Sequence, residues 1–168
     1  MSEVDLVQLL GNPYSQWGEN NEVVNLHSQT TELIKRAERY LTILSYGINN
    51  KEIVDVIIEQ KHKHPNLKVD IYVDAEQQAR RGEGLIKKMQ RHGIQVSYYL
   101  DRGSSLHMKL LLIDKTWAVF SSANLTYRGE EKNIEMGIVL KGPTVKFACQ
   151  AVETLIAGLT NDGKIHSY

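Results

Sequence analysis

This sequence has very little cysteine and no excess of either charge. A single cysteine, Cys149, stands among 168 residues, which excludes an intrachain disulfide framework and a cysteine-rich zinc site. Lys and Arg number 20 and Asp and Glu also number 20, so the formal net charge is +0, and nothing indicates a polybasic or acidic tail. No apolar run approaches the ~20 residues that span a bilayer, and no basic segment precedes the first apolar residues. We therefore expect neither a membrane anchor nor a secretory signal, and we predict a cytoplasmic location.

The composition that remains is that of an ordinary globular protein. Hydrophobic residues make up 42% and charged residues 24%, a balance that favours a packed core over disorder. The length suits one domain that spans residues 1–168. Within it we predict a short N-terminal helix or loop over residues 1–20, with the helix stopped near Gly11-Asn12-Pro13. We also predict a frayed polar tail over residues 160–168.

Apolar spacing predicts helices that alternate with strands early in the chain and strands that cluster later. The helical segments are residues 28–39, 51–62, 76–92 and a last one that begins at Pro143. The strand-like segments are residues 40–48, 67–73, 94–100, 107–114, 117–121 and 133–140. This order predicts an α/β fold, an αβα sandwich in which helices flank a mixed central sheet.

The segment from Leu106 to Asp114 places a histidine and a lysine at the start of an otherwise apolar strand. Because side chains alternate between the two faces of a strand, His107 and Lys109 point the same way. A solvated strand would keep the polar alternation, whereas this one continues with leucines and an isoleucine. The polar pair therefore needs a functional explanation.

Three more polar side chains stand at the ends of the strands that follow. Ser122 and Asn124 share a parity just after an apolar strand, so a short extended segment would present a hydroxyl and an amide to one site. Glu135 lies near the start of the next apolar strand, two residues after Asn133. With the histidine and the lysine, the set offers an imidazole, an ammonium, a hydroxyl, a carboxamide and a carboxylate.

This set of groups suits phosphodiester transfer. Lys109, Ser122 and Asn124 would supply a cation and hydrogen-bond donors to the equatorial oxygens of a phosphoryl transition state. A neutral imidazole such as that of His107 can attack phosphorus, and the leaving oxygen needs an acid that titrates near neutrality. A carboxylate at the far ring nitrogen would fix the tautomer of the imidazole, a role that suits Glu135.

The pattern H-x-K-x4-D, followed by S-S-x-N and by an Asn-x-Glu strand, resembles the HKD motif of the phospholipase D superfamily. The order of helices and strands is similar over nearly the whole chain, which implies a phospholipase D-like fold. By this resemblance Asp114 is a structural residue of the motif. The sequence departs from the family pattern at Ser121, where many members have glycine. We expect Ser121 to keep the turn and to narrow the phosphate pocket.

The resemblance implies a double displacement without a metal ion or any other cofactor. One histidine forms a phosphohistidine, while a second protonates the leaving oxygen and then activates water. An active site of this family needs two HKD motifs, and this chain has one. It therefore resembles the small single-motif nucleases that form symmetric homodimers, in which each subunit contributes His107.

The resemblance leaves the substrate open among three possibilities. We expect a DNA endonuclease, with RNA as a further substrate, and with Arg128 and Lys132 placed to touch a polynucleotide. Small relatives of this kind resemble nucleases of restriction and anti-phage systems, so a helicase or another defence protein is an expected partner. The alternatives are a hydrolase of cardiolipin or phosphatidyl esters, and a non-catalytic DNA-binding module in a defence complex.

A basic stretch in the third helical segment has two interpretations. Five basic residues surround Glu83 between positions 80 and 91. They form either a solvated helix face or a strip that contacts the phosphate backbone, since electrostatic fields act locally even in a neutral protein.

Overall fold

Alternating apolar residues build one mixed sheet, which holds nine strands in the part of the chain that the structure describes. The structure is a computed structural model that describes residues 7–12 and 23–167. The strands are β1 (Val7–Asn12), β2 (Val23–Asn25), β3 (Tyr40–Ser45), β4 (Lys68–Asp74), β5 (Gln95–Tyr99), β6 (Lys109–Ile113), β7 (Trp117–Ser121), β8 (Glu135–Lys141) and β9 (Ile165–Ser167). The helices are α1 (Leu26–Ile34), α2 (Lys51–Lys63), α3 (Ala75–Arg81), α4 (Glu83–Arg91), α5 (Tyr127–Glu131) and α6 (Thr144–Asn161).

The strands lie side by side in the order β2-β1-β8-β7-β6-β3-β4-β5-β9. The neighbours β3, β4 and β5 are parallel, as are β1 and β2, and the other neighbours are antiparallel. Ser45 at the end of β3 stands opposite Lys109 at the start of β6, and Ser121 at the end of β7 stands opposite Gly137 in β8. The polar ends of the central strands therefore meet at one end of the sheet.

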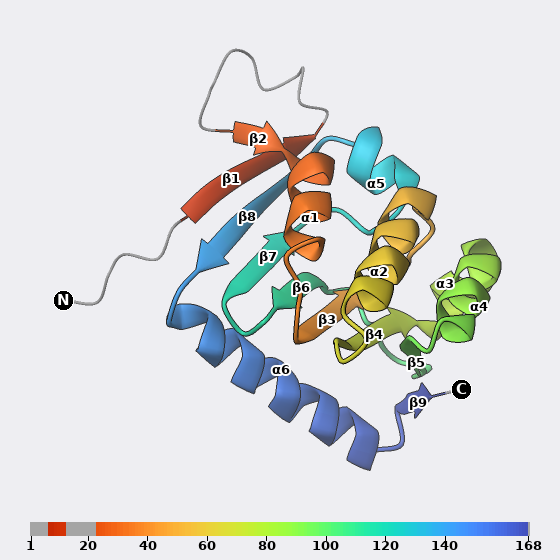
Figure 1. Ribbon diagram of the computed structural model, residues 1–168. Helices are drawn as coiled ribbons and strands as arrows, with labels where there is room; N and C mark the ends of the chain where they lie inside the picture. The colour runs from red at the N-terminus through yellow and green to blue at the C-terminus, as the bar shows by residue number, and fades with distance from the viewer. Residues whose placement is uncertain (1–6, 13–22, 168) are drawn as a thin grey trace.

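Two apolar cores attach the helices to the two faces of the sheet (Figure 1). The larger core joins α1, α2 and α4 to one face and includes Leu111 and Ile113 of β6. The smaller core joins α6 to the other face and includes Leu110 and Leu112. Alternate residues of β6 thus enter opposite cores, and each buried leucine or isoleucine stabilises the fold by about 1.5–3 kcal/mol.

Polar side chains just ahead of four helices determine where those helices begin. The side chains of Asn25, Asn50, Asp74 and Thr126 accept hydrogen bonds from backbone N–H groups in the first turns of α1, α2, α3 and α5, respectively. Each bond satisfies an N–H group that has no partner within the helix. One of these capping residues, Thr126, lies two residues beyond Asn124 in the sequence.

The predicted fold class, an αβα sandwich around a mixed sheet, is confirmed. The predicted third helix is divided into α3 and α4 at Gly82, where a Cβ atom would lie 2.0 Å from the Gln78 side chain and 2.4 Å from the Ile48 carbonyl oxygen. Among the described residues, no helix combines the length and the apolar character that crossing a bilayer requires.

The predictions for both ends of the chain are wrong where the structure describes them. Residues 7–12 form strand β1, because their backbone pairs with β8 over six residues; the rest of the predicted N-terminal helix or loop over residues 1–20 lies outside the described residues. The predicted tail over residues 160–168 holds the end of α6 and then β9, which pairs with β5. Short strands of this kind form because their backbone pairs with a neighbouring strand. The local spacing of apolar residues does not reveal that pairing.

Candidate active site

His107 and Lys109 lie together at the mouth of β6. The Lys109 ammonium nitrogen Nζ is 2.9 Å from His107 Nδ1 and 3.2 Å from Nε2, and it donates a 2.7 Å hydrogen bond to the His107 carbonyl oxygen. The exposed His107 ring also lies 4.8 Å from the Tyr46 ring, centroid to centroid. β6 begins at Lys109, so the strand predicted from residue 107 starts two residues too early, and His107 stands in the loop before it.

Lys109 is half-buried, and burial lowers the pKa of its ammonium group, while the charge of Glu135 opposes that shift. Its Nζ also lies 5.6 Å from the centre of the Tyr46 ring. A cation with little water around it attracts an incoming phosphate more strongly than a fully hydrated one does.

Ser122, Asn133 and Glu135 form a hydrogen-bonded group next to the histidine–lysine pair. The Ser122 hydroxyl donates to Glu135 Oε2 and accepts the Met136 N–H at 3.1 Å, and Asn133 Nδ2 donates to Glu135 Oε1 at 3.2 Å. Both carboxylate oxygens thus have partners, and within the described residues no hydrogen bond joins Glu135 to His107. The prediction that Glu135 fixes the tautomer of His107 is therefore not supported by a direct contact between the two side chains among the described residues.

Asn124 stands in the loop after β7, and other strands hold that loop in place. Ser45 Oγ accepts the Leu125 N–H at 3.3 Å, and the Leu125 carbonyl oxygen accepts the N–H groups of Asn49 and Asn50 at 3.0 and 3.2 Å. The Asn124 oxygen Oδ1 is buried and has no hydrogen-bond partner among the described residues.

Asp114 lies at the far end of β6, away from this group of residues. Its carboxylate accepts the backbone N–H groups of Glu38, Arg39 and Tyr40 at 3.0, 2.8 and 2.7 Å. Asp114 and Lys115 both have positive φ angles, as the two central residues of a type I′ turn require. These contacts tie the β6–β7 turn to the start of β3.

Ser121 closes β7 beside Ser122. Its hydroxyl donates to the Ala123 carbonyl oxygen at 3.2 Å and accepts the Ala123 N–H at 3.1 Å, so the side chain bonds to its own turn. The residue opposite is Gly137, where a Cβ atom would lie only 2.9 Å from the Ser121 Cβ. The glycine on the neighbouring strand leaves room for the serine.

Sequence reasoning missed Asp74, which positions the segment that carries His107. The Asp74 carboxylate accepts the Gln77 N–H at 3.1 Å, which caps α3, and the Leu106 N–H at 3.2 Å, which holds the residue before His107. Asp74 directly follows an apolar strand and precedes a helix, so it had the signal of an N-cap. Nothing local to it points to a bond with a loop 32 residues away.

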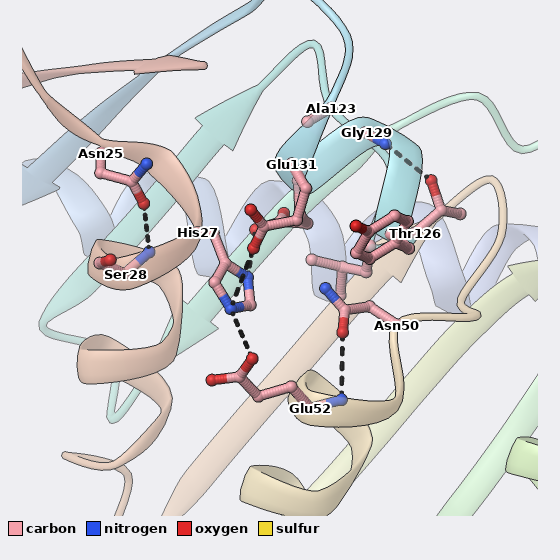
Figure 2. Close-up of polar contacts among 12 residues, drawn as sticks. Asn25, His27, Ser28, Asn50, Glu52, Ala123, Thr126, Gly129 and Glu131 are labelled. Atoms are coloured by element: carbon pink, nitrogen blue, oxygen red, sulfur yellow. Dashed lines mark hydrogen bonds and ion pairs between the residues drawn. The ribbon is translucent and has the colours of Figure 1, made fainter. Parts of the chain in front are cut away.

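A charge cluster around the buried side chains of His27 and Glu130 was also missed, because His27 alone in the sequence resembles a surface or capping residue. The cluster brings His27 at the start of α1 against carboxylates from α2 and α5 (Figure 2). His27 Nδ1 lies 3.3 Å from Glu130, and Nε2 lies 3.2 Å from Glu52 and 3.5 Å from Glu131. None of these contacts has the alignment of a regular hydrogen bond, so we treat them as ion pairs.

Contact with Glu130 is the main cause that raises the pKa of His27 to about 9, and burial of the ring opposes it. Burial raises the pKa of Glu130, while the charge of His27 opposes that shift. At neutral pH the histidine is therefore a cation, and it holds α5 three residues beyond Asn124 against α1 and α2.

The structure places the predicted nucleic-acid contacts on and just beyond α5. Arg128 is exposed and lines the same polar cavity as Asn124. The Lys132 ammonium lies 5.6 Å from the centre of the Tyr127 ring.

The basic stretch on α3 and α4 is partly neutralised. Lys87 pairs with Glu83 at 2.6 Å, and Lys88 pairs with Asp55 at 2.5 Å. These pairs favour a solvated helix face over a phosphate-binding strip. In the described part of the chain, no three His, Cys, Asp or Glu side chains are arranged to hold a metal ion.

Comparison with known proteins gives a family. A family model described as "Cardiolipin synthase, PLD-like domain" matches residues 30–156, which is most of the chain. A curated relative, "DISARM protein DrmC" from Bacillus paralicheniformis, is 30% identical over 122 residues, which cover 68% of this chain and 49% of the relative. The chain thus spans about half the length of that relative.

Solved structures resemble the whole fold at low sequence identity. Nuc from Salmonella typhimurium, described as a phospholipase D family member, has a TM-score of 0.72 and 18% identity, covering 98% of this chain and 99% of that one. NucT from Helicobacter pylori has a TM-score of 0.76 and 18% identity, covering 92% and 97%. Phosphatidylserine synthase from Haemophilus influenzae has a TM-score of 0.67 and 15% identity, covering 98% and 39%. At these identities the likeness is one of fold.

Proposed function

Because the chain belongs to the phospholipase D-like domain family, we propose that it is a metal-independent phosphodiesterase that cuts nucleic acid. DNA is the expected substrate, and RNA is a further one. The contact that carries the proposal most directly is the 2.9 Å approach of the Lys109 ammonium to His107 Nδ1. A phosphate brought against that imidazole meets a half-buried cation at the same moment.

The proposed reaction has two displacements. His107 attacks phosphorus, so that a P–N bond forms while the bond to the leaving oxygen breaks, and a second imidazole gives its proton to that oxygen. Water then attacks phosphorus, the second imidazole takes a proton from it, and the P–N bond breaks to free His107. Lys109 and Asn124 stabilise the charge on the phosphoryl oxygens in both steps, and Ser122 does so when its hydroxyl proton turns from Glu135 to the phosphate.

We propose that the second imidazole comes from a second copy of this chain. Among the described residues, the side chains at His107 are those of Tyr46 and Lys109, and neither supplies an imidazole. Beside the site, Ile134 and Met136 flank Glu135 and are 78% and 46% exposed. Apolar side chains left in water next to a site that lacks one catalytic group suit a two-fold interface, in which the same surface meets itself.

Phospholipid is the second candidate substrate, and the same exposed side chains favour it. Ile134 and Met136 would contact acyl chains, and the description of the matching family model names a lipid enzyme, cardiolipin synthase. A non-catalytic DNA-binding module is the third candidate, although every side chain that the proposed chemistry requires of one subunit is present.

For the biological setting we propose anti-phage defence in the cytoplasm. The support is the 30% identity to a protein named for the DISARM system. A helicase or another defence protein would then be the partner that brings the substrate.

The experiment compares the wild-type protein with His107→Ala on labelled single-stranded DNA, duplex DNA, RNA and cardiolipin vesicles, each with and without excess EDTA. We expect wild-type cleavage of DNA and a loss of at least ~1,000-fold in His107→Ala, because the nucleophile is gone. His64→Ala removes a histidine at the end of α2, and it is the control for the effect of losing any histidine.

Cleavage of vesicles alone would replace nucleic acid with lipid as the substrate. Equal DNA binding without cleavage by either protein would leave the binding module as the function, and abolition by EDTA would contradict the metal-free mechanism.

A further inference from the structure

A polar cavity adjoins the candidate active site and shares Asn124 with it. It encloses about 250 Å³, and we call it the amide pocket; its wall includes Tyr46, Asn49, Gln77, Asn124, Arg128 and Asn133. These residues come from the loop after β3, from α3, from the loop after β7, and from α5 and the loop beyond it. Tyr46 belongs to the pocket and to the site, since its ring is also 4.8 Å from the His107 ring. A group bound in the pocket would lie one side chain away from the nucleophile.

Several polar groups of the amide pocket lack partners. Asn124 Oδ1 is buried without a hydrogen bond to any described residue. The Gln77 side-chain amide makes no hydrogen bond, and Arg128 makes no ion pair, with the part of the chain that the structure describes. Buried polar atoms in folded proteins almost always have a partner, so an unpaired one in a cavity wall points to a ligand.

The floor of the pocket is rigid. The buried Gln78 side chain donates to the Ile48 carbonyl oxygen and accepts the Ile48 N–H, both at 2.9 Å. Asn49 Oδ1 accepts the Tyr127 N–H at 3.2 Å, which ties the loop after β3 to α5. A pocket held in this way exists before the ligand arrives, which lowers the cost of ordering on binding.

The lining matches the chemistry of a nucleobase. Side-chain amides and guanidinium groups pair with the donor and acceptor atoms on base edges, and a tyrosine ring offers a face on which a base stacks. The volume lies below the roughly 300–1,000 Å³ of pockets for drug-sized ligands, so it suits one base and not a base pair. A lining this polar gives an acyl chain nothing to pack against.

We propose that the amide pocket binds one unpaired nucleobase next to the phosphate that is cut. This rests on the proposed nuclease function and narrows its substrate to single-stranded nucleic acid. Gln77 and Arg128 would recognise the edge of the base, while Tyr46 separates the base from the reacting phosphate.

The experiment measures two activities of the same protein: cleavage of a labelled single-stranded oligonucleotide, and hydrolysis of bis(4-nitrophenyl) phosphate, which carries no base. We expect Gln77→Ala to lower the ratio of the first to the second about tenfold, the effect of one lost base-edge contact. Gln150 is an exposed residue of α6, so Gln150→Ala is the matched control and should keep the wild-type ratio. The wild-type protein should also cut the single strand at least ~10-fold faster than the same strand in a perfect duplex.

Each possible result either supports or overturns the proposal that the amide pocket binds a base. A lower ratio in Gln77→Ala together with a single-strand preference supports the pocket. An unchanged ratio, or equal cleavage of duplex and single strand, overturns it and leaves the nuclease proposal standing. Hydrolysis of bis(4-nitrophenyl) phosphate without cleavage of any oligonucleotide would instead remove the nuclease proposal, and this inference with it.

Discussion

His27 is an ionised histidine held in the interior by carboxylates from two helices. Glu52 of α2 and Glu130 and Glu131 of α5 surround its ring, and Glu130 is itself 1% exposed. Removal of two such charges from water is costly, and their attraction must offset that cost. The attraction between His27 and these carboxylates therefore holds α5 in place only while His27 keeps its proton.

This dependence gives a test by pH. The pKa of His27 is about 9 in the folded protein and 6.5 as its ordinary value, so its stabilisation is complete below pH 6.5 and is lost as pH rises through 9. At about 1.4 kcal/mol for each pKa unit, the contribution is on the order of 3 kcal/mol. Urea unfolding should show His27→Gln far less stable than wild type at pH 6, with the gap closing towards pH 9. A gap that does not change with pH would contradict the ionised pair, and His64→Gln serves as the control.

At the scale of elements, α5 is a short helix whose position depends on one glycine. A Cβ atom at Gly129 would lie 2.5 Å from the Asn124 carbonyl oxygen and 3.1 Å from both Asn124 N and Thr126 Oγ1. Two of these three atoms belong to the backbone of the loop that carries Asn124, so they cannot turn aside as a side chain would.

Gly129→Ala should therefore displace the Asn124 loop. We expect a loss of about 1–3 kcal/mol in the free energy of unfolding, and a fall in phosphodiesterase activity of ten-fold or more. The control is Gly84→Ala in α4, where nothing lies within 4 Å of the added atom. That variant should gain up to ~1 kcal/mol, since alanine is the better helix former. Thermal melts and initial rates measure both, and unaltered activity in Gly129→Ala would refute the argument.

The elements that local spacing predicts are those with long apolar periodicity. Strands such as β7 and helices such as α2 carry their own pattern, and their predicted bounds lie within a residue or two of those observed. The spacing around β1 predicts a helix or loop because its few apolar residues satisfy both periods, and only the pairing of β1 with β8 makes it a strand. β9 and α5 are too short to carry a pattern at all.

The site divides in the same way. His107 and Lys109 stand at the start of an otherwise apolar strand, so the sequence alone predicts them as site residues. Asp74, His27 and Gln78 act through partners that are distant along the chain, and their roles depend on contacts that only the folded sheet creates. No local pattern encodes such contacts.

At the scale of the whole molecule, one subunit holds only part of the proposed active site. The site has one imidazole among the described residues, and apolar side chains stand exposed beside it. Both observations are explained if two copies meet across the mouth of β6, because the meeting buries Ile134 and Met136 and supplies the second His107 together.

A mixing experiment tests this. If each site needs His107 from both subunits, an equal amount of His107→Ala protein, allowed to exchange, should lower the wild-type rate to about half. If subunits act alone, the rate should not change. Ile134→Lys should shift the protein to monomers in sedimentation and lower its activity. Phe147→Lys, which alters an equally exposed apolar residue on α6, should do neither.

The two bonds of Asp74 join the wall of the amide pocket to the segment that carries His107. One carboxylate oxygen holds the start of α3, which carries Gln77 and the wall of the amide pocket. The other oxygen holds Leu106, the residue before His107. If a base binds in the amide pocket as proposed, a displacement of α3 would therefore reach the backbone next to His107 through one side chain.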